Sequence, residues 1–203
     1  MPHEISPENL KALLPNWSLG LQSMAQEMNS LDALLGDGDL GTTLARCGVN
    51  MQEALPSMPD TLEGIFKVLA QSCAKASGSS FGTLLAVGFL TAAKSVGERS
   101  TMNRELMASI LQAVVAALSS RGGAKLGDKT MLDSLEAIRK VLAAGEGQSD
   151  LQKLACDAAL DALDLLRNNP NRIGRASMFS ERSVGMDDPG MVAVWRMTQN
   201  LAA

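Results

Sequence analysis

The chain is almost without histidine. Its 203 residues contain one, His3, beside Pro2 in a terminal stretch, residues 1–10, that we expect to be poorly ordered. This argues against a Ser-His-Asp or Cys-His mechanism, a histidine-ligated zinc site and a phosphohistidine intermediate. Any chemistry must therefore rely on carboxylates, cations, backbone amides and bound metal.

The chain also lacks a basic excess and a long apolar run. Its net charge is −4, which argues against a general nucleic-acid binder, although a few local cations or metal ions suffice to bind a nucleotide. The most apolar segment, Leu84 to Ala93, is too short to cross a bilayer, and the first residues do not resemble a signal peptide. We expect neither a nucleic-acid partner nor a membrane partner.

Cysteine is scarce as well. Cys47, Cys73 and Cys156 are odd in number, far apart and set among alanine and leucine. This pattern favours small core residues in a reducing compartment over disulfides or zinc ligands. We therefore expect a cytoplasmic protein.

What is abundant points to helices. Alanine, leucine and methionine dominate, β-branched residues are sparse, and no Asn-Gly hairpin signal appears, so the chain reads as all-α. Apolar residues recur every three or four positions, which predicts eight helices near 17–35, 41–55, 59–76, 80–97, 102–120, 129–144, 149–167 and 189–202. Mostly short connections predict an antiparallel up-and-down bundle, with residues 1–203 forming a single domain.

Several boundaries carry their own signals. Asp60, Asp128 and Asp188 are expected helix N-caps, and Pro189 stands behind Asp188 at the preferred first helical position. The longest irregular stretch runs from Asn168 to Asp188. A loop of about twenty residues in a compact domain is usually functional, so this stretch is a candidate lid.

Three aspartates crowd one short segment, Leu31-Asp-Ala-Leu-Leu-Gly-Asp-Gly-Asp-Leu-Gly-Thr-Thr43. If the first helix stops near Leu35, the flanking glycines let Asp37 and Asp39 fold back towards Asp32. Oxygen-only ligands suit Mg²⁺ together with phosphate oxygens. The alternative is an ordinary turn in which Asp39 or Thr42 caps the next helix. An EF-hand is excluded by its spacing, which requires glutamate where Gly48 stands.

Two further loops bear on this choice. Ala76-Ser-Gly-Ser-Ser-Phe-Gly-Thr83 precedes an apolar helix, and such a loop is either an anion site or a plain N-cap. Gly122-Gly-Ala-Lys-Leu-Gly-Asp-Lys-Thr130 fails as a P-loop because Asp128 separates Gly127 from the lysine. For Lys129, a solvated lysine and a phosphate contact are equally compatible with the sequence. Asp133 is either a surface residue or an acceptor behind the site.

Together these blocks resemble the L-type subunit, or kinase domain, of the dihydroxyacetone kinase family. The matching stretches are Leu31–Asp39, Ser77–Thr83, Gly127–Asp133, Gly174–Ser177 continuing to Glu181–Gly185, and Asp188–Gly190. They occur in the family's order and cover the chain from about residue 17 to its end. The sequence departs from the family pattern at Leu40 and Met186, where histidine is usual, and at Ser180, where glycine is usual.

The resemblance implies an eight-helix barrel with ADP or ATP and two Mg²⁺ at one rim. By that pattern the metal ligands are Asp32, Asp37 and Asp39. The same three aspartates together with Arg175 are the implied catalytic residues. The implied nucleotide contacts are Leu40, Gly41, Thr42, Thr43, Ser77, Gly78, Gly122, Met131, Arg175, Asp188, Pro189 and Gly190.

The resemblance also implies partners. The ketone substrate, dihydroxyacetone or a related short ketose or triose, would be held by a separate K-type subunit, and a phosphotransferase-system protein commonly rephosphorylates the bound ADP of free-standing L units. The sequence leaves open whether the donor is ATP or that protein, and whether the chain forms a homodimer. Two other hypotheses stay open: a non-catalytic, nucleotide-loaded regulator, suggested by the missing histidines, and a bundle whose aspartates merely cap helices.

Overall fold

The computed structural model describes residues 4–76, 79–145 and 150–201, and within these ranges the chain is almost entirely helical. This confirms the all-α prediction. The helices are α1 Pro7–Ser23, α2 Ala25–Leu35, α3 Leu40–Ala54, α4 Leu62–Lys75, α5 Ser80–Val96, α6 Arg104–Gly122, α7 Met131–Ala144, α8 Leu151–Leu166 and α9 Pro189–Gln199. Short 3₁₀ turns are η1 Leu55–Ser57, η2 Arg175–Phe179 and η3 Glu181–Ser183.

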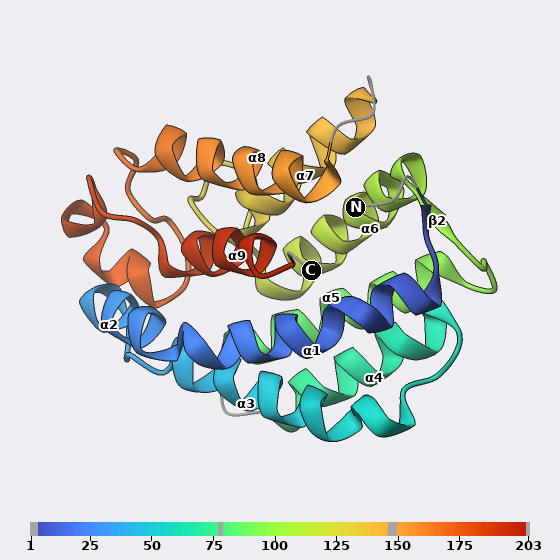
Figure 1. The fold of residues 1–203 in the computed structure, drawn as a ribbon. Coiled ribbons are helices and arrows are strands. Elements are labelled where there is room, and N and C mark those ends of the chain that lie inside the picture. Colours follow the sequence, from blue (N-terminus) through green and yellow to red (C-terminus); the bar gives the residue numbers. More distant parts are fainter. Residues whose placement is uncertain (1–3, 77–78, 146–149, 202–203) are drawn as a thin grey trace.

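The helices close into a ring. Each helix from α2 to α8 packs against the next one in sequence, α1 packs on α3, and α9 returns to contact α1 and α2. In Figure 1 α1, α3 and α4 lie along one side of the ring and α7 and α8 along the opposite side. Local connections between consecutive helices therefore produce a closed up-and-down barrel.

The first helical segment differs from the expectation. The predicted helix over 17–35 is two helices that meet at Met24, and the first of them begins at Pro7 rather than near residue 17. Ser6 caps α1, because its hydroxyl accepts the Asn9 amide while the Asn9 side chain accepts the Ser6 amide. Proline at the first position suits a helix start.

The described part of residues 1–10 is also more regular than expected. Glu4–Ile5 (β1) pairs antiparallel with Met102–Asn103 (β2), and Ile5 is buried. This two-residue pairing is too short for any periodic signal in the sequence. It ties the chain before α1 to the turn before α6.

Helix caps follow the sequence in part. Asp188 caps α9 with Pro189 behind it, as predicted. The predictions for Asp60 and Asp128 are wrong, because the next hydroxyl residue does the capping in both cases: Thr61 caps α4 and Thr130 caps α7. Aspartate and threonine are both good N-caps, so candidates one or two residues apart cannot be separated by residue type.

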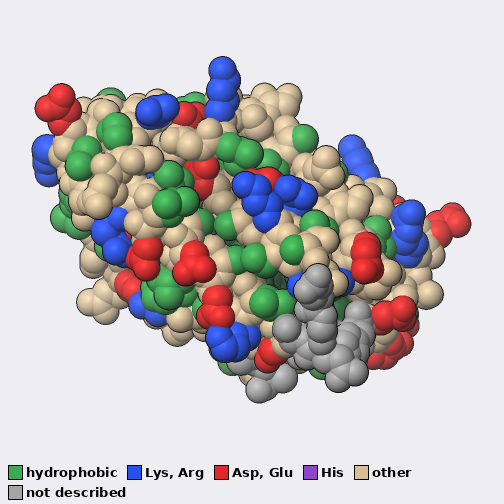
Figure 2. Space-filling view, turned by 90° about the horizontal axis from the view of Figure 1, so that it is seen from above, with side chains coloured by type: hydrophobic (Ala, Val, Ile, Leu, Met, Phe, Trp, Pro, Cys, Tyr) green, Lys and Arg blue, Asp and Glu red, His purple; other side chains and the backbone are tan. Residues whose placement is uncertain are grey.

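The core fills the inside of the ring with leucine, methionine, isoleucine, valine and alanine from every helix. Cys47 and Cys73 are free and buried within it, as predicted, whereas the free Cys156 is only partly buried. An apolar cavity of about 340 Å³ lies among Trp17, Phe89 and Val114. On the face shown in Figure 2, acidic and basic side chains are interspersed rather than gathered by sign. Within the described ranges, no helix combines the length and apolarity needed to cross a membrane.

Candidate functional site

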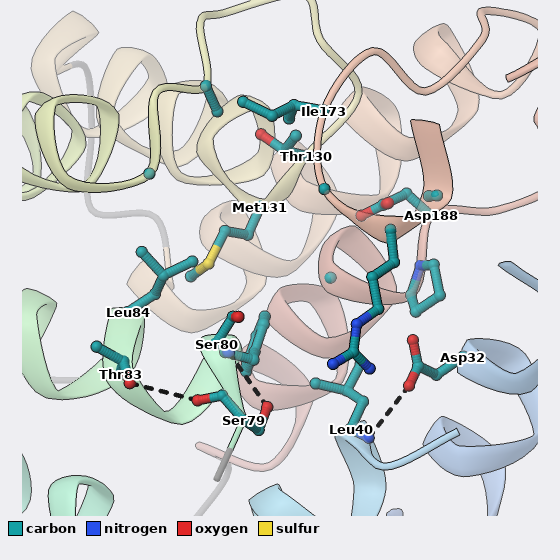
Figure 3. A pocket seen from close by; sticks show the side chains of 18 of the residues that line it. Asp32, Leu40, Ser79, Ser80, Thr83, Leu84, Thr130, Met131, Ile173 and Asp188 are labelled. Atoms are coloured by element: carbon teal, nitrogen blue, oxygen red, sulfur yellow. Dashed lines mark hydrogen bonds between the residues drawn. The ribbon is translucent and has the colours of Figure 1, made fainter. Parts of the chain in front are cut away.

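One end of the barrel carries a cleft of about 680 Å³. Its walls come from the ends of α2, α3, α5, α6, α7 and α9 and from the irregular segment between α8 and α9. Figure 3 shows Asp32 and Leu40 on one side of the cleft, Ser79, Ser80 and Thr83 on another, and Met131, Thr130 and Ile173 opposite them. The volume lies in the range of small-ligand and cofactor sites.

Four helix N-termini meet at this cleft. The N-cap residues of α3, α5, α7 and α9, which are Asp39, Ser79, Thr130 and Asp188, all line it. This convergence follows from the up-and-down ring, since alternate helices start at the same end. Each N-terminus presents backbone amides and a partial positive charge, so the cleft is suited to an anion such as phosphate.

The three clustered aspartates converge at the same place. One carboxylate oxygen from each of Asp32, Asp37 and Asp39 lies within 4.8 Å of the others. α2 ends at Leu35, as the sequence predicted, and Gly38 adopts a positive φ of 75° that turns the chain back. The site thus has the hard oxygen ligands that a divalent cation such as Mg²⁺ prefers.

Asp32 also holds the turn itself. Its Oδ2 accepts the amides of Asp39 at 3.0 Å and Leu40 at 3.3 Å, at the start of α3. Figure 3 shows the bond to Leu40. The Asp39 side chain makes no capping bond. The alternative of an ordinary turn, in which the side chain of Asp39 or Thr42 caps α3, is therefore wrong. The carboxylate of Asp32, from α2, accepts these amides instead, and the Asp39 carboxylate lies in the aspartate cluster.

The cleft has more acid than base. Its described lining includes four aspartates, Asp32, Asp37, Asp39 and Asp188, and two arginines, Arg121 and Arg175. Arg175 forms an ion pair with Asp37, in which both side chains are substantially exposed. A phosphate entering this cleft would meet net repulsion unless divalent cations entered with it.

The other half of the cleft is apolar. Leu84, Leu118, Met131 and Ile173 form a surface to which Gly122 contributes open backbone, because the nearest atom to an added Cβ there would be 3.7 Å away. A flat apolar ligand of the size of a nucleobase would find cover here. Gly122 and Met131, which the resemblance assigned to an adenine pocket, both lie in this apolar half.

Lys129 is neither a solvated lysine nor a phosphate contact. Its side chain is fully buried, and Nζ donates to the carbonyl oxygens of Arg167, Asn169 and Ser183, each at 2.8 Å. Its backbone has a φ of 63°, and among the described residues it is the one non-glycine residue with a positive φ. Burial lowers the pKa of Lys129, while Asp188 and Asp187 act in the opposite direction.

Asp188 is buried beside this lysine. Its carboxylate accepts the Met191 amide at 2.9 Å and the Asn171 amide group at 2.8 Å. Burial raises the pKa of Asp188 to about 6, although the hydrogen bonds and Lys129 lower it. The Asp188-Pro189-Gly190 turn lines the cleft, as does Gly174-Arg175-Ala176.

Gly41, Thr42 and Thr43, which the resemblance assigned to the nucleotide, are not among the residues that line the cleft. The Thr42 amide donates to Asn29 Oδ1 at 2.9 Å, and the Thr43 amide donates to the Asp39 carbonyl at 3.0 Å. Gly41 is buried where α3 meets α2, and a Cβ there would lie 1.9 Å from the Ala25 carbonyl oxygen. Gly41 and Thr42 contact α2, whereas the Thr43 side chain lies next to Gly82 of α5. Ser77 and Gly78 lie outside the described residues.

The structure adds residues that the sequence did not single out. Ser79, Ser80 and Thr83 belong to the hydroxyl-rich stretch before α5, which was a usable signal. Arg121 and Ile173 had no signal, because their place depends on how α6 ends at the rim and on an irregular segment. Asp133 accepts the amides of Thr130 at 2.8 Å and Gly127 at 2.6 Å, which makes it an acceptor behind the cleft wall.

Fold and site together define a helical-barrel protein whose cleft at one rim combines clustered carboxylates with helix N-termini. The sequence matches the DAK2 domain over residues 34–203. It is 31% identical over 171 residues to the ADP-binding subunit of PEP-dependent dihydroxyacetone kinase 1 from Listeria innocua, covering 84% of this chain and 82% of that one. The chain belongs to the DAK2 domain family.

Two other relatives extend the comparison. The ADP-binding subunit of the PEP-dependent dihydroxyacetone kinase of Escherichia coli is 31% identical over 191 residues, covering 88% of this chain and 87% of that one. The crystal structure of the C. freundii dihydroxyacetone kinase in complex with AMP-PNP and Mg²⁺ matches with a TM-score of 0.74 at 25% identity. That match covers 95% of this chain but 33% of the longer kinase chain.

Proposed function

We propose that this chain is the nucleotide-binding, Mg²⁺-dependent phosphoryl-transfer subunit of a kinase for dihydroxyacetone or a related short ketose or triose. The observation that carries the proposal is the convergence of three carboxylates and four helix N-termini on one cleft. Relatives named as ADP-binding kinase subunits, and a related kinase crystallised with AMP-PNP and Mg²⁺, support it.

Asp32, Asp37 and Asp39 would hold the metal, as two Mg²⁺ ions. The donor set fits, because all three offer carboxylate oxygens within 4.8 Å of one another. When bound, the ions would offset the charge of the phosphates and of the aspartates at the same time. Asp32 keeps its two backbone bonds to the start of α3 and so fixes where the cluster stands.

The nucleotide would lie across the cleft. Its phosphates would face the aspartate cluster and the N-terminus of α5 at Ser79 and Ser80, and its base would lie against Met131 and Gly122. Leu40 and the Asp188-Pro189-Gly190 turn would close the sides. The apolar half of such a site would exclude water from the base. In the other half, the bound Mg²⁺ would offset the negative charge of the phosphates and the aspartates.

Phosphoryl transfer requires positioning and charge stabilisation more than covalent chemistry from the protein. Arg175 is suited to the second task, because its guanidinium lies at the aspartate cluster on a segment that also lines the cleft. No histidine is needed for such a mechanism. Within the described residues none is present.

The ketone would be held by another protein, a K-type subunit. The described cleft offers no separate sugar-binding histidine, and the two relatives above are named as subunits rather than as whole kinases. Their PEP dependence favours a phosphotransferase-system protein over free ATP as the phosphoryl donor. A cytoplasmic location accords with this chemistry.

Reconstitution tests the proposal. The purified chain is combined with a K-type subunit, dihydroxyacetone, Mg²⁺ and either ATP or a phosphorylated phosphotransferase-system protein. Formation of dihydroxyacetone phosphate that depends on all components is the expected result. Absence of the sugar phosphate with either donor, although the chain binds Mg²⁺·ADP, would refute the catalytic assignment.

That refuting result would favour a second function, a nucleotide-loaded regulatory subunit. Leu40 and Met186 motivate it, because they stand where the family usually has histidine. Leu40 is buried at the cleft wall, so a leucine in place of the usual histidine makes this part of the site less polar. A regulator would bind the K-type subunit in a nucleotide-dependent way without turnover.

A further inference from the structure

The irregular segment 167–188 is organised around one buried lysine. The three hydrogen-bond donors of the Lys129 ammonium group are matched by three backbone carbonyls, those of Arg167, Asn169 and Ser183. These carbonyls come from both ends of the segment. The lysine therefore joins the start of the segment, just after α8, to its end, just before α9.

A second layer of bonds extends from the same point. Asn171 donates from its side-chain amide to the Lys129 carbonyl at 2.9 Å and to Asp188 at 2.8 Å. Its backbone amide donates to Ser183 Oγ at 2.8 Å. Asn171, Ser183 and Asp188 are all buried. The polar interior of the segment is thus built on Lys129 and ends at the α9 cap.

This network lies directly behind the cleft wall. Thr130 and Met131, the next two residues after Lys129, line the cleft, and so does Asp188. Arg175 is carried by the segment at η2 and reaches the aspartate cluster. Displacing the segment would therefore move Arg175 and the Asp188-Pro189-Gly190 turn relative to the aspartates.

The backbone of Lys129 supports a dedicated role. A lysine with a φ of 63° is in a left-handed conformation that non-glycine residues seldom adopt. Glycine would meet the backbone requirement with less strain, but it has no ammonium group. The residue at this position must supply both the turn and three donors, which a lysine does.

We propose that Lys129 is a positioning residue that holds the 167–188 segment against the cleft, and thereby sets how tightly and how long the nucleotide is retained. The inference rests on the proposed nucleotide site. It adds that retention depends on a side chain that touches neither metal nor phosphate. Removing the ammonium takes a donor from all three carbonyls. The carbonyls of Arg167 and Ser183 keep the amides of Gly185 and Met186, whereas Lys129 is the one donor described for that of Asn169, so the hold on the segment is weakened.

The test uses the fluorescent nucleotide mant-ADP with Mg²⁺, the full chain, and the variant Lys129→Met. Dissociation is followed after dilution into excess ADP. The expected result is release faster by about tenfold or more, because small displacements of positioning groups have large effects. The dissociation rate reports only folded, loaded molecules, so a lower fold stability alone does not change it. Lys140→Met, the same change at an exposed lysine of α7, is the control and should release at the wild-type rate.

Native-state hydrogen exchange gives an independent measurement. Within the segment, the Asn171 amide donates to Ser183 Oγ and the Gly185 amide donates to the Arg167 carbonyl. The Arg172 amide joins the segment to the loop before α7, because it donates to the Asp128 carbonyl. These three amides should lose protection in Lys129→Met while the α5 and α6 amides keep theirs. If Lys129→Met does not fold, Asn171→Ala replaces it, with the same expected direction in both measurements.

The outcomes distinguish a failure of the inference about Lys129 from a failure of the proposed function. Unchanged release and unchanged protection in a folded variant would overturn the inference. If the wild-type chain binds no Mg²⁺·mant-ADP, the proposed function fails, and the exchange measurement still decides whether Lys129 holds the segment. Faster release together with lost protection confined to 167–188 supports both.

Discussion

Asp37 is the most exposed member of the aspartate cluster and makes its described contact with Arg175 alone. Its carboxylate is thus not needed to hold the turn, in contrast to that of Asp32, which bonds two amides. Removing the charge at Asp37 therefore separates metal binding from folding. This makes it the most informative single position of the cluster.

For Asp37→Asn we expect Mg²⁺-dependent ADP affinity to fall by about a hundredfold or more, the loss of about 3 kcal/mol. Calorimetric titration of ADP in the presence of Mg²⁺ measures it, and circular dichroism checks that the helix content is retained. Asp161→Asn, at an exposed aspartate of α8, is the matched control and should bind normally. Wild-type affinity in Asp37→Asn would show that the metal is held elsewhere.

The burial of Asp188 predicts that the stability of the fold depends on pH. Burial raises its pKa to about 6 in the folded state, above the value of about 3.9 expected in the unfolded chain. Folding therefore takes up a proton between these values. The stabilising contribution of the group is fully present below about pH 3.9 and is lost as the pH rises through about 6.

Comparison with Asp188→Asn isolates this effect, since the substituted residue does not titrate. The wild-type free energy of unfolding, minus that of the variant, should fall by up to about 3 kcal/mol between pH 4 and pH 7. Urea unfolding at several pH values measures the difference. A difference that stays constant, or grows with pH, would mean that Asp188 is ionised throughout, kept so by Lys129 and the α9 amides.

At the scale of the element, α3 depends on a close approach to α2. Gly41 lies where the two helices touch, with the Ala25 carbonyl 1.9 Å from the position of an added Cβ. Asn29 and Asp32 of α2 bond the first amides of α3. The orientation of the aspartate cluster is therefore a property of this helix pair.

Gly41→Ala should destabilise the fold by about 3 kcal/mol or more, because the methyl group meets backbone rather than a movable side chain. Gly88→Ala in α5 is the control. There the nearest neighbour of the added Cβ would be Val114 at 3.5 Å, so helix propensity should dominate and stabilise by up to about 1 kcal/mol. Chemical denaturation measures both. Equal stability of the two variants would contradict the close packing of α2 and α3.

The elements also show what sequence could and could not predict. Periodic apolar spacing predicted most helices because each buries one face in the ring. It missed the break at Met24, where a single residue separates α1 from α2. Thr61 and Thr130 were missed as caps because an aspartate stands one residue before the first and two residues before the second.

The site was predictable where chemistry is local and not where it depends on the fold. The aspartate segment contains its own glycines and turn, so Asp32, Asp37 and Asp39 could be placed together from their spacing. Lys129 could not be placed, since its partners lie about forty residues further along the chain. Gly41 was assigned to phosphates by the resemblance, although in the structure it is buried against α2. The metal and nucleotide roles themselves stay predictions.

At the scale of the whole molecule, the closed ring places the cleft where six helices begin or end. A ligand that bridges α2, α3, α5, α7, α9 and the 167–188 segment contacts most of the barrel at once. Binding should therefore stabilise the whole fold rather than one loop. This follows from mass action for any ligand that binds only the folded state.

Thermal unfolding tests that expectation. With Mg²⁺·ADP at one hundred times its Kd, the stabilisation is about 2.7 kcal/mol, which corresponds to a rise in Tm of about 5–10 °C for a chain of this length. ADP with EDTA, and Mg²⁺ alone, serve as controls and should shift Tm much less. A bundle whose aspartates only cap helices would show no dependence on the combination.

The most direct test of the central claim is calorimetric titration of ADP into the wild-type chain, once with Mg²⁺ and once with EDTA. We predict saturable one-to-one binding with Mg²⁺ and at least about a hundredfold weaker binding with EDTA, a difference of about 2.7 kcal/mol or more. Absence of ADP binding in Mg²⁺, or equal affinity in both buffers, would contradict a metal-dependent nucleotide site at Asp32, Asp37 and Asp39.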